Sequence, residues 1–238
     1  MSLVLDVEPG DIIVKQNDGG SWDAVKILEL DRFPDGSPTA HCLTYQPMAG
    51  RPEPSSLQGL PVRIWHAPVA ARSFAAGWEW IANQAVTKQD LLGFIEYLKL
   101  TDFPRYIQVS GQDVNAIVGR ANEHYQRAYE LGTAGKRSEA VREYSAAIDL
   151  FPLFYEAIDN RAFTYMELGR IEEALADFEA SLRVNPDGAA AFFSKGECLL
   201  KLGRLAEAEA VFSAGIPRFP EHRANFTKFL ALARQKQR

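Results

Sequence analysis

Several features that mark membrane, secreted and disulfide-rich proteins are scarce in this sequence. It has two cysteines, Cys42 and Cys198, and because they fall in separate predicted modules among apolar neighbours, we expect buried free thiols rather than a disulfide. No run approaches the roughly 18 apolar residues that a transmembrane helix requires. The opening MSLVLDVEPGD lacks a basic region followed by an apolar core and a cleavage site. We therefore expect a cytoplasmic protein with no membrane partner.

Recognisable catalytic motifs are also missing. The sequence has no Gly-x-x-x-x-Gly-Lys phosphate loop, no Gly-x-Ser-x-Gly elbow and no His-Glu-x-x-His pair. The four histidines, His41, His66, His124 and His222, are scattered along the chain, and His124 falls at a packing position. We predict no catalytic residues, no metal site and no cofactor, so the chain is not expected to be an enzyme. The formal net charge of -5 argues against general nucleic-acid binding.

A repeat of fixed length is present in the second half of the chain. Three prolines, Pro152, Pro186 and Pro220, are spaced 34 residues apart. The same spacing relates three glycines, three Glu-Ala pairs and three aromatic residues that precede the prolines. The members of these sets are Gly135, Gly169 and Gly203; Glu139-Ala140, Glu173-Ala174 and Glu207-Ala208; and Tyr144, Phe178 and Phe212.

Each repeat predicts two helices joined by a turn that contains the glycine. Apolar residues recur three or four positions apart on both sides of that glycine, which places them along one side of a helix. Small residues on the first helix, Ala128, Ala162 and Gly196, are expected to face the alanine of each Glu-Ala pair, since two helices approach closely only where side chains are short.

This pattern resembles the tetratricopeptide repeat, a 34-residue helix pair that stacks into a right-handed solenoid. The resemblance covers residues 121–222 and implies repeats at 121–154, 155–188 and 189–222. Residues 223–236, RANFTKFLALARQK, have the spacing of the capping helix that such a solenoid needs at its open end. The resemblance implies three helix pairs and a cap within residues 111–238.

The first part of the chain has the composition of a small β domain. Short β-rich stretches at 3–7, 12–15, 22–30, 39–45 and 60–66 are separated by Pro-Gly and Asp-Gly turns. Five short strands predict a small antiparallel barrel over residues 1–68, and PGDIIVKQNDGGSWDAVKILEL resembles the opening of SH3-like and Tudor-like barrels.

A helical connector is predicted between the two parts, over residues 69–110. Within it, a helix at 88–100 opens with Thr87 three residues before Asp90, a spacing typical of a capping box. The predicted fold class is therefore multidomain α+β: an N-terminal antiparallel β-barrel followed by an all-α solenoid.

The resemblance implies that the first helix of each pair lines a concave groove. Tyrosine and phenylalanine provide rigid contact area there, and the neighbouring acids suit an extended or helical peptide that carries apolar anchors and basic groups. The alternative is that the helix at 88–100 covers part of this surface. The predicted groove residues are Asn122, Tyr125, Gln126, Tyr129, Glu156, Asp159, Asn160, Phe163, Glu167, Phe193, Ser194, Glu197 and Lys201.

One specialised function of the family is not expected. Some members bind the C-terminal carboxylate of a chaperone through a clamp of lysines, asparagines and an arginine. The corresponding positions here hold Tyr125, Tyr129, Asn160, Ala190 and Ser194, and only Asn160 matches. A carboxylate would be desolvated without a cationic partner, at a cost of several kcal/mol, so we predict no carboxylate clamp.

A basic residue also recurs once per repeat, at Arg127, Arg161 and Lys195. We expect these side chains to pair with acids such as Glu143 or Asp177 on the neighbouring helix. The alternative is a stripe that follows phosphates.

The function that these observations favour is a non-catalytic adaptor, which binds a peptide or protein segment in the groove. A second hypothesis is a dedicated inhibitor, such as an immunity protein that blocks a toxin. A third is weak nucleic-acid association through the barrel, which the overall acidity disfavours.

Overall fold

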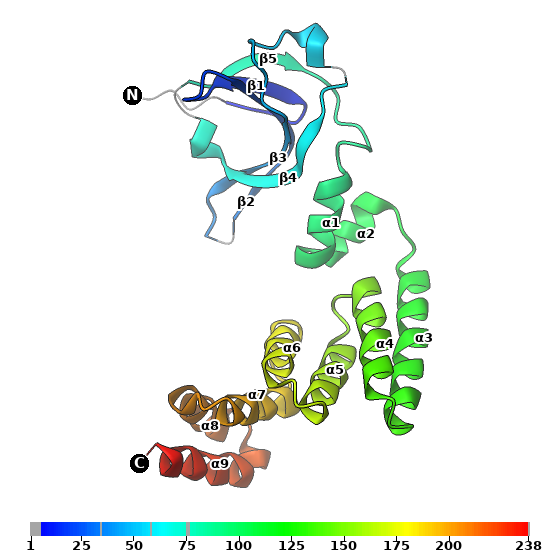
Figure 1. The fold of residues 1–238 in the computed structure, drawn as a ribbon, viewed down its shortest axis with the longest axis vertical. Coiled ribbons are helices and arrows are strands. Elements are labelled where there is room, and N and C mark those ends of the chain that lie inside the picture. The colour runs from blue at the N-terminus through cyan, green and yellow to red at the C-terminus, as the bar shows by residue number, and fades with distance from the viewer. Residues whose placement is uncertain (1–5, 34, 58, 75–76, 238) are drawn as a thin grey trace. The chain divides into compact units, whose positions relative to one another are not determined.

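The computed structural model of the chain describes residues 6–33, 35–57, 59–74 and 77–237. It divides into two compact units, residues 1–111 and residues 112–238, which we call the sheet unit and the helical unit. The first contains an antiparallel sheet and the second contains packed helices (Figure 1). The chain is therefore a multidomain α+β protein, as predicted.

The sheet unit is built on a curved five-stranded antiparallel sheet in the order β4-β3-β2-β1-β5 (Figure 1). Apolar side chains on both faces of β1 are buried, with Ile13 in one cluster and Ile12 and Val14 in another. The strands are β1 (Asp11–Gln16), β2 (Trp22–Arg32), β3 (Pro38–Tyr45), β4 (Val62–Ala70) and β5 (Glu79–Asn83). Four of the predicted strands thus correspond to β1, β2, β3 and β4.

The prediction of a barrel ending at residue 68 and a helical connector from residue 69 is wrong in its boundary. β4 runs to Ala70, and residues 79–83 form β5, which pairs with β1 through Ile12 opposite Ala82. Residues 3–5 of the first predicted strand lie outside the described residues, and Asp6 and Val7 are in no strand. β5 contains the strand-favouring Trp80 and Ile81, but it is short, and its pairing with β1, some 70 residues away, has no signal in the local sequence.

Two short helices complete the sheet unit: α1 (Leu92–Thr101) and α2 (Phe103–Ser110). The predicted Thr87 and Asp90 pair is present, because Thr87 N and Oγ1 donate to Asp90 Oδ2 and Asp90 N donates to Thr87 Oγ1. Asp90 also accepts from the buried Lys26 Nζ at 2.8 Å. The regular helix nevertheless begins at Leu92 rather than at residue 88.

A pair of histidines lies under α1. His41 on β3 and His66 on β4 are joined by a hydrogen bond of 2.9 Å between His41 Nδ1 and His66 Nε2. Phe94 and Tyr97 of α1 pack against both rings. Burial lowers the pKa of His41 and lowers the pKa of His66 to about 4, to which the neighbouring His41 also contributes.

The sheet unit is expected to lose stability as the pH falls from about 6.5 towards about 4. Both histidines have folded-state pKa values below the ordinary value of 6.5, so the unfolded chain binds protons that the folded chain does not. Asp31 and Glu29 on β2 oppose this shift at His41, while Arg105 on α2 reinforces it.

Urea unfolding followed by tryptophan fluorescence checks this, because Trp22, Trp65, Trp78 and Trp80 all lie in the sheet unit. His66→Gln should reduce the change in the free energy of unfolding of the sheet unit between pH 7 and pH 5. His222→Gln, which changes an exposed histidine of the helical unit, should leave that change as it is in the wild type. A pH dependence as steep in His66→Gln as in the wild type would contradict the assignment to this pair.

The helical unit consists of successive antiparallel helix pairs (Figure 1). The helices are α3 (Val114–Thr133), α4 (Arg137–Leu150), α5 (Tyr155–Glu167), α6 (Ile171–Val184), α7 (Ala189–Lys201), α8 (Leu205–Arg218) and α9 (Arg223–Lys236). The recurring glycines Gly135, Gly169 and Gly203 have φ between 73° and 77° in the three interhelical turns, a conformation that glycine adopts without strain. The 34-residue spacing of the glycines and prolines therefore reflects one backbone unit, a pair of helices with the turn between them, which is repeated.

Small residues bring the two helices of each pair together, as predicted. Ala128 and Ala140, like Ala162 and Ala174, are fully buried. In the last pair the contact leaves no room for a side chain, since a Cβ atom added to Gly196 would lie 2.6 Å from the Phe212 ring.

Gly215→Ala is expected to destabilise the helical unit by about 1–3 kcal/mol, as overpacking does in dense cores. A Cβ atom at Gly215 would lie 2.2 Å from the ring of Phe226 on α9, and that ring is itself packed against Phe192, Phe193 and Phe219.

Gly119→Ala on α3 is the matched control, since a Cβ atom there meets nothing within 4 Å. This second change should stabilise the unit by about 0.5–1 kcal/mol, because alanine favours a helix interior more than glycine does. Far-ultraviolet circular dichroism during urea unfolding measures both. A Gly215→Ala protein as stable as Gly119→Ala would contradict the described packing.

Candidate functional site

The predicted groove residues lie on the first helix of each pair, α3, α5 and α7. They differ in how much of each side chain is accessible. The exposed ones are Asn122, Gln126, Tyr129, Glu156, Glu167 and Lys201; the half-buried ones are Tyr125, Asp159, Asn160, Phe163, Phe193 and Glu197; and Ser194 is buried. Tyr129 is the most open aromatic among them, with 60% of its surface exposed.

Groove positions of the first two repeats are in direct contact. Asn160 Nδ2 on α5 donates to the hydroxyl of Tyr125 on α3 at 2.8 Å. The Tyr125 ring packs on Tyr144 of α4 and on Phe154, with ring centroids 5.8 and 5.0 Å apart. The hydrogen bond uses one donor of Asn160, the single residue that matched the carboxylate clamp.

Two predicted contact aromatics also belong to the core. Phe163 packs against Phe178 with centroids 5.0 Å apart. Phe193 packs against Phe212 of α8 at 5.6 Å and against Phe229 of α9 at 4.8 Å. Only part of each ring is therefore accessible to a ligand, and removing either ring also removes core packing.

The acids among the predicted groove residues fall into two groups. Glu167 forms an ion pair with Arg137. Glu156, Asp159 and Glu197 have no ion pair with any described residue within the helical unit. Burial raises the pKa of Asp159, and Glu156 and Asp177 raise it further, against a hydrogen bond from Ser181. Asp159 Oδ1 is buried and has no hydrogen-bond partner among the described residues.

Burial also raises the pKa of Glu197, and the nearby Lys201 opposes that shift. Half-buried carboxylates without a cationic partner carry a desolvation cost that a bound cation would relieve. A cation would lower this cost most at Asp159, because the neighbouring Glu156 and Asp177 raise the pKa of that carboxyl further.

The basic residue that recurs in each repeat pairs with acids, and the prediction of interhelical ion pairs is confirmed. Arg161 Nε and Nη2 donate to both oxygens of Asp177 at 2.7 and 2.8 Å. Arg127 pairs with Glu143, which also bonds His124 Nδ1. In the third repeat the equivalent acid position holds Val211, and Lys195 pairs instead with Glu179 on α6 of the second repeat at 2.9 Å. These contacts favour a structural role over a phosphate-binding stripe.

α9 continues the row of first helices. One surface hollow of about 180 Å³ is lined by Ala189, Ala190 and Phe193 near the start of α7 and by His222 and Asn225 at the start of α9. Another, of about 200 Å³, is lined by residues near the ends of the same two helices. α9 therefore runs beside α7 in the same direction, as the first helix of a further repeat would.

The sequence predicts only a capping role for residues 223–236, whereas in the structure these residues also line both hollows. Phe226, Leu230 and Ala233 form the buried side of α9. Phe229, Leu232 and Lys236 form a second side, which lines the hollow near the helix end. The spacing of three and four residues between the members of this second set was the available signal.

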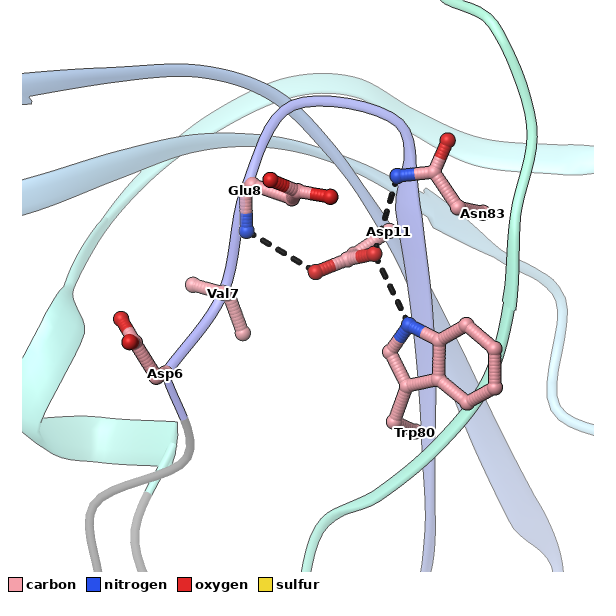
Figure 2. A pocket seen from close by; sticks show the side chains of 6 residues that line it. All are labelled: Asp6, Val7, Glu8, Asp11, Trp80 and Asn83. Atoms are coloured by element: carbon pink, nitrogen blue, oxygen red, sulfur yellow. Dashed lines mark hydrogen bonds between the residues drawn. The ribbon is translucent and has the colours of Figure 1, made fainter.

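A separate hollow of about 380 Å³ lies in the sheet unit (Figure 2). At its centre, Asp11 Oδ1 accepts hydrogen bonds from Trp80 Nε1 at 2.8 Å and Asn83 Nδ2 at 3.0 Å, and Oδ2 accepts from Glu8 N at 2.9 Å. Each carboxylate oxygen is already bonded. These contacts tie the turn before β1 to β5, which favours a structural role for Asp11.

The described residues contain neither a candidate membrane-spanning helix nor a candidate metal site. No helix there is both long enough and apolar enough to cross a bilayer. No cluster of three or more histidine, cysteine, aspartate or glutamate side chains is arranged to hold a metal ion in that part of the chain.

Comparison with known proteins places the repeat. A model of the tetratricopeptide repeat family matches residues 160–222. No curated protein matches the chain.

Several solved structures are similar. The first tetratricopeptide repeat domain of Spaghetti (RPAP3), bound to an HSP90 peptide, is 22% identical, with a TM-score of 0.46 over 50% of this chain and 93% of that one. The TPR2B domain of yeast Sti1, in complex with an Hsp70 peptide, is 22% identical, with a TM-score of 0.46 over 50% and 98%. The Yersinia enterocolitica secretion chaperone SycD, with a peptide of the translocator YopD, is 20% identical, with a TM-score of 0.46 over 49% and 94%.

The family match falls on α5, α6, α7 and α8, where the 34-residue period, the small interhelical residues and the turn glycines all recur. Residues 160–222 therefore match the tetratricopeptide repeat family, and the resemblance predicted from the sequence is confirmed over that range.

Proposed function

We propose that this protein is a non-catalytic adaptor whose helical unit binds a segment of another polypeptide across α3, α5, α7 and α9. Stacked helix pairs of this kind form an extended concave surface from their first helices. Helical or extended peptides bind such surfaces by placing apolar anchors in successive depressions.

The observation that carries this proposal is the pair of hollows between α7 and α9, which lie on either side of the contact between Phe193 and Phe229. The same row of helices presents the exposed ring of Tyr129 on α3. Aromatic rings and shallow apolar hollows along one row of helices suit the anchors of a peptide.

The charge on α5 favours a basic residue in the part of the ligand that crosses it. Glu156 and Asp159 lie one helical turn apart, neither has an ion pair within the helical unit among the described residues, and the repulsion from Glu156 raises the pKa of Asp159. A lysine or arginine of the ligand would relieve that repulsion.

The test is a selection from a random dodecapeptide library displayed on phage, with the full-length protein as the target. A groove variant, Tyr129→Ala with Glu156→Lys, changes two exposed side chains and leaves the core aromatics in place. The matched control is Leu153→Ala with Glu172→Lys, which makes the same kinds of change at exposed positions outside the first helices.

Peptides enriched on the wild type should bind the groove variant at least about tenfold more weakly, which corresponds to about 1.4 kcal/mol, and should bind the control unchanged. Fluorescence anisotropy with the synthetic peptides gives the dissociation constants. Equal affinities for the wild type and the groove variant would show that binding occurs elsewhere.

A further inference from the structure

The hollow near the ends of α7 and α9, which we call the C-terminal hollow, has a lining unlike the rest of the predicted groove. It is formed by Glu197, Leu200 and Lys201 of α7 and by Phe229, Leu232 and Lys236 of α9. Its volume of about 200 Å³ is below the range of about 300–1,000 Å³ that is usual for small-molecule sites, so one side chain of a partner is a better match than a metabolite.

The lining of the C-terminal hollow is apolar at its base. Leu200 is buried, and Phe229 is half-buried against Phe193 and Phe212, with ring centroids 4.8 and 5.5 Å away. Leu232 remains 38% exposed, although it is a large apolar residue on a helix that buries its opposite side. An apolar side chain placed here would remove this surface from water at low reorganisation cost, because Phe229 is already fixed by its neighbours.

Two lysines flank this apolar surface. Lys201 and Lys236 have no ion pair with the described residues of the helical unit, whereas Lys195 on α7 pairs with Glu179 and Arg234 on α9 pairs with Glu209. The one acid in the lining, Glu197, is half-buried, while both lysines are exposed. The accessible charge at the hollow is therefore positive, opposite in sign to that of Glu156 and Asp159 on α5.

We propose that the C-terminal hollow binds an apolar side chain that is followed directly by an acidic residue in the partner polypeptide. The apolar group would contact Leu200, Phe229 and Leu232, and the acidic group would lie between Lys201 and Lys236. This inference rests on the proposed peptide-binding function and adds the direction in which the ligand crosses the helices. The basic part of the ligand lies over α5, and the apolar and acidic part lies at α7 and α9.

Two synthetic dodecapeptides test the inference. Both consist of serine and glycine residues apart from one leucine and the two residues that follow it. Those two residues are Glu-Asp in the first peptide and Lys-Arg in the second. Fluorescence anisotropy gives their affinities for the full-length protein, and amide chemical shifts of Leu200 and Leu232 in two-dimensional NMR spectra locate the binding. The acidic peptide should bind at least about tenfold more tightly than the basic one and should shift both resonances.

Charge reversal supplies the matched pair of variants. Lys201→Glu with Lys236→Glu should invert the preference between the two peptides. Arg223→Glu with Lys228→Glu makes the same change in net charge at exposed positions of α9 outside the hollow, and should keep the preference for the acidic peptide.

The inference is overturned if the basic peptide binds as tightly as the acidic one, if neither peptide binds, or if both double variants weaken the acidic peptide equally. With any of these results, the proposed function still holds if the library selection yields peptides whose affinity depends on Tyr129 and Glu156. Conversely, a selection that fails while the acidic peptide binds at the hollow would overturn the proposed groove across α3 and α5 alone.

Discussion

Arg161→Ala is expected to lower the free energy of unfolding of the helical unit by about 3–5 kcal/mol, the usual cost of removing one partner of a buried ion pair. Arg161 on α5 binds both oxygens of Asp177 on α6 and also donates Nη1 to Ser145 Oγ on α4 at 2.9 Å. The side chains of Arg161 and Asp177 are only 19% and 11% exposed. Without the guanidinium, Asp177 would remain buried beside Asp159 with no cation.

Arg127→Ala is the matched control, because it removes the residue that occupies the same position one repeat earlier. The side chains of Arg127 and Glu143 are 53% and 30% exposed, and Glu143 keeps its hydrogen bond to His124. The loss should be below about 1 kcal/mol, as for other exposed pairs.

Urea unfolding followed by circular dichroism reports both changes, and tryptophan fluorescence, which comes from the sheet unit alone, should be unaffected. Similar losses for the two variants would contradict the assignment of a buried pair to the second repeat.

Phe226→Ala should cost a similar amount, about 3–5 kcal/mol, which is typical of a fully buried phenylalanine. Phe226 has no exposed surface, and its ring lies within 6.5 Å of the rings of Phe192, Phe193, Phe212 and Phe219. Together with Leu230 and Ala233, it packs α9 into the core cluster that α7 and α8 share. Its removal should therefore loosen α9 and abolish both hollows beside α7.

Leu232→Ala on the same helix should change stability by less than about 1 kcal/mol, because that side chain is 38% exposed and is not one of the buried core residues. Hydrogen exchange of the α8 and α9 amides distinguishes the two variants. Phe226→Ala should accelerate exchange in α9 first, and Leu232→Ala should leave it unchanged. Unaltered protection of α9 in Phe226→Ala would show that the helix is held by other contacts.

The helical unit could be predicted from the sequence because its structure is local and periodic. Ala140, Ala174 and Ala208 each face a partner within the same repeat, so a spacing of 34 residues carries the whole pattern. The predicted cap, residues 223–236, coincides with α9. α3, in contrast, begins at Val114, seven residues before the first repeat unit, because Asp113 caps it by accepting a hydrogen bond from Asn115 N.

The sheet unit was less predictable because its order depends on contacts between distant residues. β5 exists through its pairing with β1, and Lys26 reaches Asp90, 64 positions further along the chain. His41 and His66 looked isolated in the sequence, yet neighbouring strands place their ring nitrogens 2.9 Å apart. Contacts between residues this far apart in the sequence produce no periodic pattern from which they could be predicted.

The sequence predicts which helices carry the candidate groove residues, but not how the side chains of those residues pack. The repeat pattern identifies which residues of α3, α5 and α7 lie on the first helices, but it does not show that Phe163 and Phe193 share their rings with the core. Nor does it show that Phe229, Leu232 and Lys236 of the cap complete a hollow with α7. Both properties depend on how α9 packs, which the repeat consensus leaves open.

We propose that α3, α5, α7 and α9 together form the surface that binds a polypeptide. Two-dimensional NMR of the full-length protein, titrated with a dodecapeptide enriched from the library, measures where that polypeptide binds. Saturable amide shifts are expected at exposed and half-buried residues of these four helices, including Tyr129, Asn160, Glu197 and Leu232. Shifts confined to α4, α6 and α8, or to the sheet unit, would contradict this proposal.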